Sequence, residues 1–479
     1  MSKINIASII DYLNQELGCS LDSSYYKQIK EWEDWWRGYH EPFHHFKEVN
    51  GQKLLDRDMY TLKMAKKVCE DWAAILLNEK TELVLDDKAS SEFLLGKDGS
   101  GGILGESDFW TRANELVEKA FYSGTGAVIV RLNDLALVDD LAVPDEKSRI
   151  SLEYVSAQQI IPLTVRQGHV IDAAFASEVL YQGKTYVYLE THILKSGGYT
   201  ITNQYFEEEH GSLKLRELPA GMLQSFDTGS DIPLFAVVQP NIVNNLEHHV
   251  GLGISVFANA IDNLKGVDLA FNNFCRDLKL GGKKVFLNQT LTQTDQSGNL
   301  ITPDDVAQQL FLQMGDGDLD QEKLIHEFNP DLRTEANKEA VQAQLDYLSF
   351  KVGLGTKHYQ FNAGSVVTAT QYMGDKQELI QNASKHYIAV ERFLQQLVRA
   401  VLWAGREILQ QPVNPDAAVV VNFEDSYIID KESERQRDQQ EVRDGLMNKW
   451  EYRVKWYGED EATAKAMLET QAQGLQFEE

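Results

Sequence analysis

The chain has 479 residues, of which 43% are hydrophobic and 25% charged, the composition of a globular protein with a sizeable core. Asp and Glu outnumber Lys and Arg by 73 to 46, which gives a formal net charge of −27. Because proteins that wrap the outside of DNA are basic overall, this balance argues against that class and limits any contact with nucleic acid to a local basic patch.

Secretion, a membrane span and a disulfide framework are argued against by equally simple observations. The start of the sequence shows no secretory signal, and every apolar run is far shorter than a membrane span. The three cysteines, Cys19, Cys69 and Cys275, are widely separated and odd in number. We therefore expect reduced thiols in a cytosolic protein, with neither a disulfide framework nor a zinc site and with no membrane partner.

The first half of the chain is predicted to be helical and then β-rich. Helical spacing of apolar residues up to about Val84, including Cys69, Trp72 and Leu76, predicts a mostly helical start. The dense aromatic residues between Trp32 and Phe46 are interpreted as a buried cluster. A helix is expected over 109–123. Strands are then predicted over 127–132, 151–155, 168–175, 179–189 and 192–203.

Long helices dominate the second half. Ser255 is a plausible N-cap for a helix over 256–280, and a second helix is expected over 334–351. These two helices flank the mixed segment 283–331, so an antiparallel pair with a small subdomain at its tip is predicted. The longest helix, over 369–410, is followed by a strand over 417–423 and a charged helical region from 430. The combination predicts an α+β fold.

Several motifs resemble known sites without completing them. Gly183-Lys184-Thr185 lacks the earlier glycine of a P-loop, since Glu178 stands there, and is better explained as a hairpin turn. Gly251-Leu-Gly253 and Gly353-Leu-Gly355 lack the third glycine of a dinucleotide loop and indicate hinges or helix boundaries. No catalytic constellation is visible, so the sequence favours a protein that is not an enzyme and needs no cofactor.

Metal binding is weakly indicated at most. Asp316, Asp318, Asp320, Glu322 and Glu327 match several ligand positions of a calcium loop, but Gln321 occupies the position of the required glycine. A solvated acidic loop is therefore favoured, and calcium binding stays open. The histidines lie in two groups whose adjacency does not supply converging geometry: His40, His44 and His45, and then His248 and His249.

Two segments are locally basic despite the acidic total. Residues 251–290 hold five basic side chains against three aspartates: Lys265, Arg276, Lys279, Lys283 and Lys284 against Asp262, Asp268 and Asp277. The segment 349–368 carries Lys351, Lys357 and His358 and no carboxylate. On residue type alone, solvated lysines are favoured over a nucleic-acid contact, and both interpretations remain open.

Four stretches together resemble the portal proteins of tailed bacteriophages, in the group found in phages and prophages of Gram-positive bacteria. They are 57–80 (RDMYTLKMAKKVCEDWAAILLNEK), 251–264 with its continuation to Lys284, 348–355 leading to Thr368-Ala-Thr-Gln371, and 450–462 (WEYRVKWYGEDEA). Each is weak alone, but their order and spacing are fairly specific. Such proteins form a ring, usually of twelve subunits, at one capsid vertex, and the genome enters and leaves through the central channel.

The resemblance assigns a part to each segment. It implies a wing over 1–250, stem helices over 251–281 and 332–351, a clip over 282–331, a tunnel loop over 352–367, a spine helix with a wing strand over 368–424, and a helical crown over 425–479. Lys351, Lys357 and His358 then lie on the tunnel loop, where Gly353, Gly355 and Gly364 supply backbone freedom. Lys279, Lys283 and Lys284 are candidates for a basic ring at the channel exit or for a contact with the next ring.

The same resemblance implies partners and location. The expected partners are other copies of the chain, double-stranded DNA, the terminase large subunit, the head–tail adaptor, and the major capsid and scaffolding proteins. The expected location is the virion, with the host cytoplasm during assembly. The alternative is a minor capsid or scaffold-type protein without a channel. The packaging ATPase itself is disfavoured because the P-loop is absent.

Overall fold

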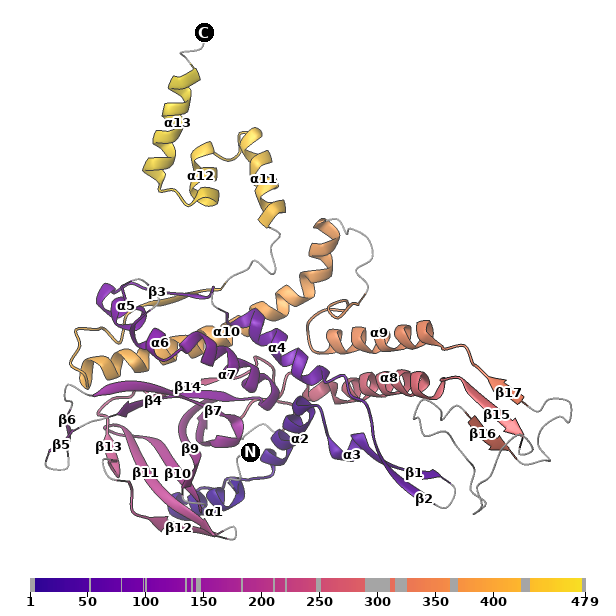
Figure 1. Cartoon of the computed structure of the whole chain (residues 1–479). Helices are drawn as coiled ribbons and strands as arrows, with labels where there is room; N and C mark the ends of the chain where they lie inside the picture. The colour runs from indigo at the N-terminus through magenta and orange to yellow at the C-terminus, as the bar shows by residue number, and fades with distance from the viewer. Residues whose placement is uncertain are drawn as a thin grey trace.

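The computed structural model describes residues 5–475 apart from 51–52, 79, 98, 100, 134–135, 139–140, 144–147, 182–183, 210–211, 220–221, 247–250, 289–310, 315–324, 362–368 and 424–430. Helices and strands are mixed along the chain, which confirms the α+β class (Figure 1). Within these ranges, no helix is both long and apolar enough to cross a membrane.

The N-terminal region contains four helices and a β-hairpin. In order they are α1 (Ile6–Leu17), α2 (Tyr25–Arg37), α3 (Glu41–His44), β1 (His45–Asn50), β2 (Lys53–Asp58) and α4 (Met64–Leu76). Trp32 and Trp35 are buried, as the aromatic-cluster interpretation requires, whereas Tyr39 is exposed. The prediction of a mostly helical start was wrong for 45–58. There β1 ends at Asn50, which pairs with Lys53 at the start of β2, and the two strands are antiparallel.

Two sheets form the β-rich region beneath α7 (Phe109–Ser123) (Figure 1). The smaller has the order β14-β4-β7, with β14 at Phe235–Val238, β4 at Gly126–Asn133 and β7 at Arg149–Ser156. Its central strand is buried from Gly126 to Val130, because α7 and α10 cover it. Two short helices precede α7: α5 (Lys88–Leu95) and α6 (Gly102–Glu106).

The larger sheet is antiparallel, with the order β12-β11-β10-β9-β8 and β13 paired to β11. Its strands are β8 (Ile160–Arg166), β9 (His169–Tyr181), β10 (Lys184–Lys195), β11 (Gly198–Glu209), β12 (Ser212–Arg216) and β13 (Ser225–Asp227). The predicted strands 179–189 and 192–203 were each misplaced across a hairpin. Tyr181 pairs with Lys184 and Lys195 with Gly198, so the chain reverses within both predicted strands. Short strands β5 (Ala136–Val138) and β6 (Leu141–Val143) pair separately.

Two antiparallel helices project from this body, and we call them the rod: α8 (Ile261–Leu280) and α9 (Thr334–Lys351) (Figure 1). A small sheet, β16-β15-β17, lies at their far end, with β15 at Lys284–Asn288, β16 at Phe311–Met314 and β17 at Ile325–Phe328. The predicted pair with a subdomain at its tip is therefore present. Ser255 does not cap α8, which starts at Ile261 after a 3-10 turn over Ala258–Ala260. The Ser255 hydroxyl instead donates to the Phe121 carbonyl inside the core.

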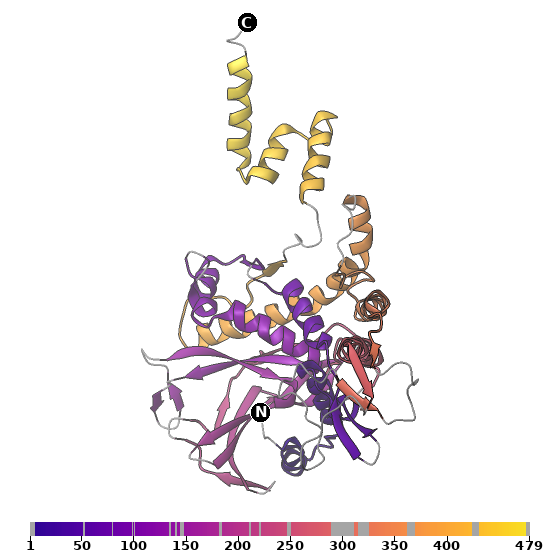
Figure 2. The same ribbon diagram turned by 45° about the vertical axis from the view of Figure 1, so that its right-hand side comes forward.

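The longest helix, α10 (Ala369–Glu407), runs back across the body, and its 39 residues span roughly 58 Å. It packs against α4, α5 and β14 (Figures 1 and 2). The chain then adds β18 (Val419–Asn422), which pairs with β3 (Glu82–Leu85) near the start of the sequence. Three helices complete it: α11 (Lys431–Arg443), α12 (Lys449–Tyr457) and α13 (Glu461–Leu475).

Candidate nucleic-acid interface

The rod is anchored to the body by a close approach of two glycine backbones. Gly124 ends α7 with φ 83°, and its carbonyl lies against Gly253 so closely that a Cβ on either residue would overlap the other. The Gly253 amide donates to the Thr125 hydroxyl at 2.8 Å, and its carbonyl accepts from the Tyr25 hydroxyl at 2.8 Å. The segment that carries Gly253 is therefore held in the core, and α8 begins only at Ile261.

Polar side chains on α8 hold the segment that follows the hairpin. Asp268 accepts from the Leu62 amide at 2.7 Å and lies 3.1 Å from His44 Nε2. Asn272 accepts from the Tyr60 amide at 3.1 Å. His44 is fully buried, and its Nδ1 accepts from the His40 amide. The His44 ring is therefore occupied by structural contacts, which argues against His44 as a metal ligand.

At the distal end of the rod an ion pair joins α8 to the start of α9. The same end carries exposed lysines. Arg333 binds both carboxylate oxygens of Asp277 at 2.7 Å, and Asn337 donates to the same carboxylate at 2.9 Å. The contacts from Asn337 and Arg333 lower the pKa of Asp277. Lys279 is exposed on the last turn of α8. Lys283 pairs with Glu327 at 2.5 Å, and Lys284 starts β15.

The proximal end of the rod stops in a tight turn against the core. Gly353 has φ 83°, and the Leu354 amide returns to the Ser349 carbonyl at 2.9 Å, a turn that satisfies the free carbonyls of α9. The Trp72 indole donates to the Val352 carbonyl at 3.2 Å, and Asn382 donates to the Gly353 carbonyl at 3.1 Å. Gly355 also has a positive φ, of 85°. Gly364 lies outside the described residues.

The predicted tunnel-loop side chains differ in their surroundings. Lys351 and Lys357 are exposed. His358 faces the body, with Nε2 3.5 Å from a carboxylate oxygen of Asp71 on α4, and the Tyr359 hydroxyl donates to that oxygen at 2.9 Å. Burial opposes ionisation of Asp71, but the contacts of His358, Lys67 and Tyr359 outweigh it and lower its pKa. The loop that starts at Val352 is thus attached to α4 through an ionised carboxylate.

The sequence-predicted basic residues therefore fall into two groups at opposite ends of the rod. Lys279, Lys283 and Lys284 lie at the distal end, and Lys351 and Lys357 at the proximal end. The 18 residues of α9 between these levels correspond to roughly 27 Å. Sequence reasoning missed Asp71 and Trp72 as the supports of the proximal group, because nothing local connects them with residues some 280 positions away.

The metal-site alternatives gain no support from the described residues. In the described ranges, no group of three His, Cys, Asp or Glu side chains converges in a way that could hold an ion. Of the calcium-like motif, Asp316, Asp318, Asp320 and Glu322 lie outside those ranges, as do His248 and His249. Glu327 is paired with Lys283.

A family model for the phage portal protein, SPP1 Gp6-like, matches residues 21–474, nearly the whole chain. The chain belongs to this phage portal protein family. Membership confirms the resemblance seen in the sequence and identifies a structural component of the bacteriophage head–tail connector. No curated protein matches the chain. Among solved structures, a chain of the "neck of native GTA particle computed with C12 symmetry" is similar, with 10% identity, 81% of this chain and 88% of that chain covered, and a TM-score of 0.36.

Proposed function

We propose that copies of this portal-family chain form a closed ring, of twelve subunits as is usual in the family, at one vertex of a phage capsid. Double-stranded DNA passes through the central channel during packaging and ejection. The observation that carries this proposal is the rod, which is fixed to the body at one end and carries a small sheet at the other, with basic residues at both ends. Repetition around a ring turns each exposed lysine into a ring of positive charge.

We assign the parts as follows. Residues 1–250 form the wing that faces the shell. Residues 251–281, which include α8, and 332–351, which include α9, form the stem, and 282–331 form the clip. Residues 352–367 form the tunnel loop, 368–424 form the spine helix with its wing strand, and 425–479 form the crown. Supporting this assignment, β15–β17 lie at the far end of the rod, and Lys351 lies at the turn that ends α9.

The charge distribution fits a channel that holds DNA weakly. Each chain has a formal net charge of −27, so the body of the ring repels the phosphate backbone. Within the rod, only the lysines at its two ends attract it. Of these, Lys351 and Lys357 are the proposed tunnel-loop contacts, whereas the His358 ring faces Asp71. Lys279 and Lys283 serve the channel exit or the contact with the next ring.

The proposed partners follow from this position. The clip meets the terminase large subunit during packaging and the head–tail adaptor afterwards. The wing meets the major capsid and scaffolding proteins. The ring belongs to the virion and assembles in the host cytoplasm.

Electron microscopy of the purified protein, with its mass measured in solution, tests the proposal. Twelve copies of this 54.3 kDa chain weigh about 650 kDa. Closed rings with a channel wide enough for duplex DNA are expected. Shell binding without a closed ring would contradict the proposal and favour a minor capsid or scaffold-type protein.

A further inference from the structure

Helix α10 carries a row of basic side chains that the lysines of the rod do not include. The members stand seven residues apart, are all exposed, and are called the α10 stripe below: Lys385, Arg392, Arg399 and Arg406. Each step is roughly 10.5 Å along the helix axis, so the stripe is roughly 32 Å long. Over 385–406 the only carboxylate is Glu391, which gives this segment a net charge of +3 in a chain whose total is −27.

The α10 stripe faces away from the core. Seven residues turn an α-helix to about 20° short of two full turns, so the four side chains stay on one side of the helix. The residues two positions before each of them are buried: Ala383, Val390, Leu397 and Ala404. Two positions correspond to about 200° around the axis, so the buried seam and the stripe lie on opposite sides of α10.

A cleft of about 240 Å³ lies beside Arg392, between α10 and the turn that joins β8 to β9. Arg392 Nη1 is 3.4 Å from His169 Nε2, and Gln396 and Asn241 also line the cleft. Among the described residues that line it there is no carboxylate. Within the part of the chain that the structure describes, Lys385 and Arg392 have no ion pair with a carboxylate. The middle of the stripe is therefore rich in hydrogen-bond donors and lacks an internal counter-ion.

The carboxylates near the stripe are exposed or otherwise engaged. Arg399 pairs with Asp416 at 3.2 Å and Arg406 with Glu407 at 2.8 Å, and more than 40% of each of these side chains is exposed. Exposed ion pairs contribute little to stability, so another anion can replace either carboxylate. Glu391 is partly exposed and accepts a hydrogen bond of 3.3 Å from the next turn of the helix.

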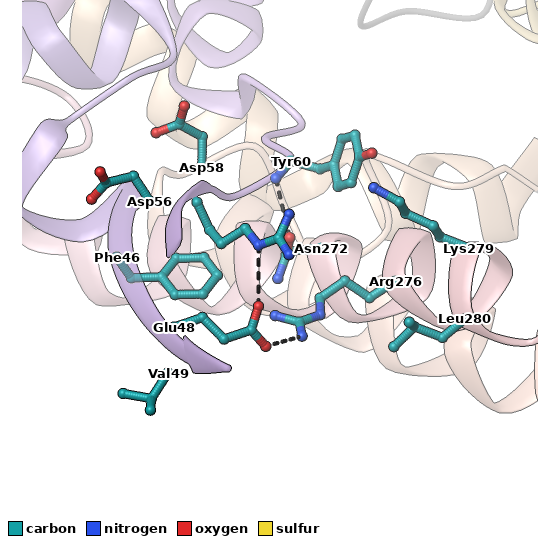
Figure 3. Close-up of a pocket in the computed structure, with 11 residues that line it drawn as sticks. Phe46, Glu48, Val49, Asp56, Asp58, Tyr60, Asn272, Arg276, Lys279 and Leu280 are labelled. Atoms are coloured by element: carbon teal, nitrogen blue, oxygen red, sulfur yellow. Dashed lines mark hydrogen bonds and ion pairs between the residues drawn. The ribbon is translucent and has the colours of Figure 1, made fainter. Parts of the chain in front are cut away.

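The cleft between the β1–β2 hairpin and α8 is a contrasting case. It is lined by as many carboxylates as basic side chains, namely Glu48, Asp56 and Asp58 against Arg57, Arg276 and Lys279. Glu48 alone binds both arginines, at 3.2 Å and 3.1 Å (Figure 3). An anion would have to displace these contacts there, whereas the middle of the α10 stripe has none to displace.

The side chains between the cations favour a phosphate backbone over a folded protein partner. Most of those exposed on this side of α10 are polar: Ser384, Gln395 and Gln396. Ile388 is the one exposed large apolar residue over 385–406, whereas protein–protein interfaces are centred on several buried apolar and aromatic residues. Arg, Lys, Ser and Gln are side chains that commonly bind DNA phosphates. Duplex DNA carries a charge about every 1.7 Å along its axis, so flexible cations spaced along a helix find phosphates within reach.

We propose that the α10 stripe binds the phosphate backbone of duplex DNA without sequence preference, as a contact separate from the lysines of the rod. Arg392, with His169 and Gln396 beside it, binds a phosphate at the centre of the stripe. The other three cations bind phosphates on either side. The inference rests on the proposed function for the presence of DNA at the ring, and it adds a surface of the body that holds this DNA.

The salt dependence of DNA binding tests the proposal. Fluorescence anisotropy of a labelled duplex of mixed sequence, longer than the stripe, gives the affinity of the full-length chain at several salt concentrations. Lys385→Gln combined with Arg392→Gln should weaken binding at low salt. It should also reduce the slope of log K against log salt by about 1.8, because two phosphate contacts are lost. Glutamine is a good helix former, so α10 should be retained, which circular dichroism checks.

A second double variant separates the stripe from net charge alone. Lys195→Gln with Arg443→Gln removes one exposed lysine and one exposed arginine outside the stripe, at the ends of β10 and α11. This control should leave the slope nearly unchanged. Equal slopes in the two double variants would overturn the proposal, as would a wild-type chain that binds no DNA at low salt.

Ring formation of the same variants distinguishes this inference from the proposed function. Normal rings whose salt slope is unchanged by the stripe variant would exclude the stripe contact and leave the ring proposal intact. A stripe variant that loses rings but binds DNA like the wild type would identify a second copy as the occupant of the stripe, which also contradicts the proposal. A wild-type chain that forms no ring would remove the proposed function, whereas a slope difference between the two double variants would still support the DNA contact.

Discussion

Tyr359 donates a hydrogen bond of 2.9 Å to Asp71, across 288 positions of sequence. Lys67 and His358 contact the same carboxylate. The segment that leaves the rod at Val352 is thereby attached to α4 by an ionised group that is nearly buried.

Replacing Asp71 with Asn should loosen this segment. The amide cannot pair with Lys67 or His358, and hydrogen bonds to charged groups contribute roughly 1.5–3 kcal/mol. We expect faster hydrogen exchange over 352–361 and a lower free energy of unfolding. Glu70→Gln, one position earlier on the exposed face of α4, is the control. Equal exchange in both variants would show that Asp71 does not hold the loop.

The carboxylate of Asp71 also predicts that the attachment of residues 352–361 to α4 depends on pH. Because the pKa of Asp71 is lowered in the folded chain, its contribution is present at neutral pH. It is lost as the pH falls below the ordinary aspartate value of about 3.9. The protection of the amides over 352–361, taken relative to the intrinsic exchange rate at each pH, should therefore fall in acid in the wild type, and the Asp71→Asn variant should lose this component of the fall.

Gly253→Ala should be strongly destabilising. The added Cβ would overlap the Gly124 carbonyl, and relief would move the anchor of the rod. A loss of about 3 kcal/mol or more in the free energy of unfolding is expected, as for other steric conflicts in a packed core. Gly197→Ala, where a Cβ meets nothing within 4 Å, should change stability by less than about 0.5 kcal/mol. Denaturant unfolding of both variants measures the difference.

His386 predicts that the free energy of unfolding decreases as the pH falls. This decrease is independent of the protonation of carboxylates such as Asp71. Burial, with a contribution from Lys385, lowers its pKa to about 3. The unfolded chain binds this proton near pH 6.5, so the free energy of unfolding falls as the pH drops from 6.5 toward 3. His386→Gln should reduce that slope by up to about 1.4 kcal/mol per pH unit.

Lys351→Ala combined with Lys357→Ala should impair genome packaging or retention while rings still assemble. Both lysines are exposed at the proximal end of the rod, so their removal costs the fold little. Lys195→Ala on the exposed end of β10 is the matched control. Packaging efficiency in a phage complementation assay is the measurement, and normal packaging by the double variant would exclude these residues as DNA contacts.

Sequence reasoning predicted the elements whose signals are local. The helices over 109–123 and 334–351 were predicted with the observed bounds, because apolar spacing marks both helices and Gly124 and Gly353 follow their C-terminal ends. The 45–58 hairpin was missed because it stands between an aromatic-rich segment and a stretch of helical apolar spacing, and the helical prediction was extended across it. Ser255 was misjudged because a capping residue and a serine that packs in the core look the same in sequence.

The supports of the candidate site could not be predicted in this way. The contacts of Asp71 with Tyr359 and of Trp72 with Val352 join residues about 280 positions apart. No local pattern couples such residues, because the pairing is decided by how α4 and the end of α9 pack together. The lysines themselves were found from the sequence, since a loop without carboxylates is visible in one chain.

The pairing of β3 with β18 has a consequence for biosynthesis. Glu82–Leu85 leave the ribosome early, whereas Val419–Asn422 follow more than 330 residues later. At translation rates of 5–20 residues per second, the first strand waits roughly 20–70 s for its partner. During that interval Leu83 and the edge of β3 lack their native cover, and an unpaired strand edge is open to pairing with other chains.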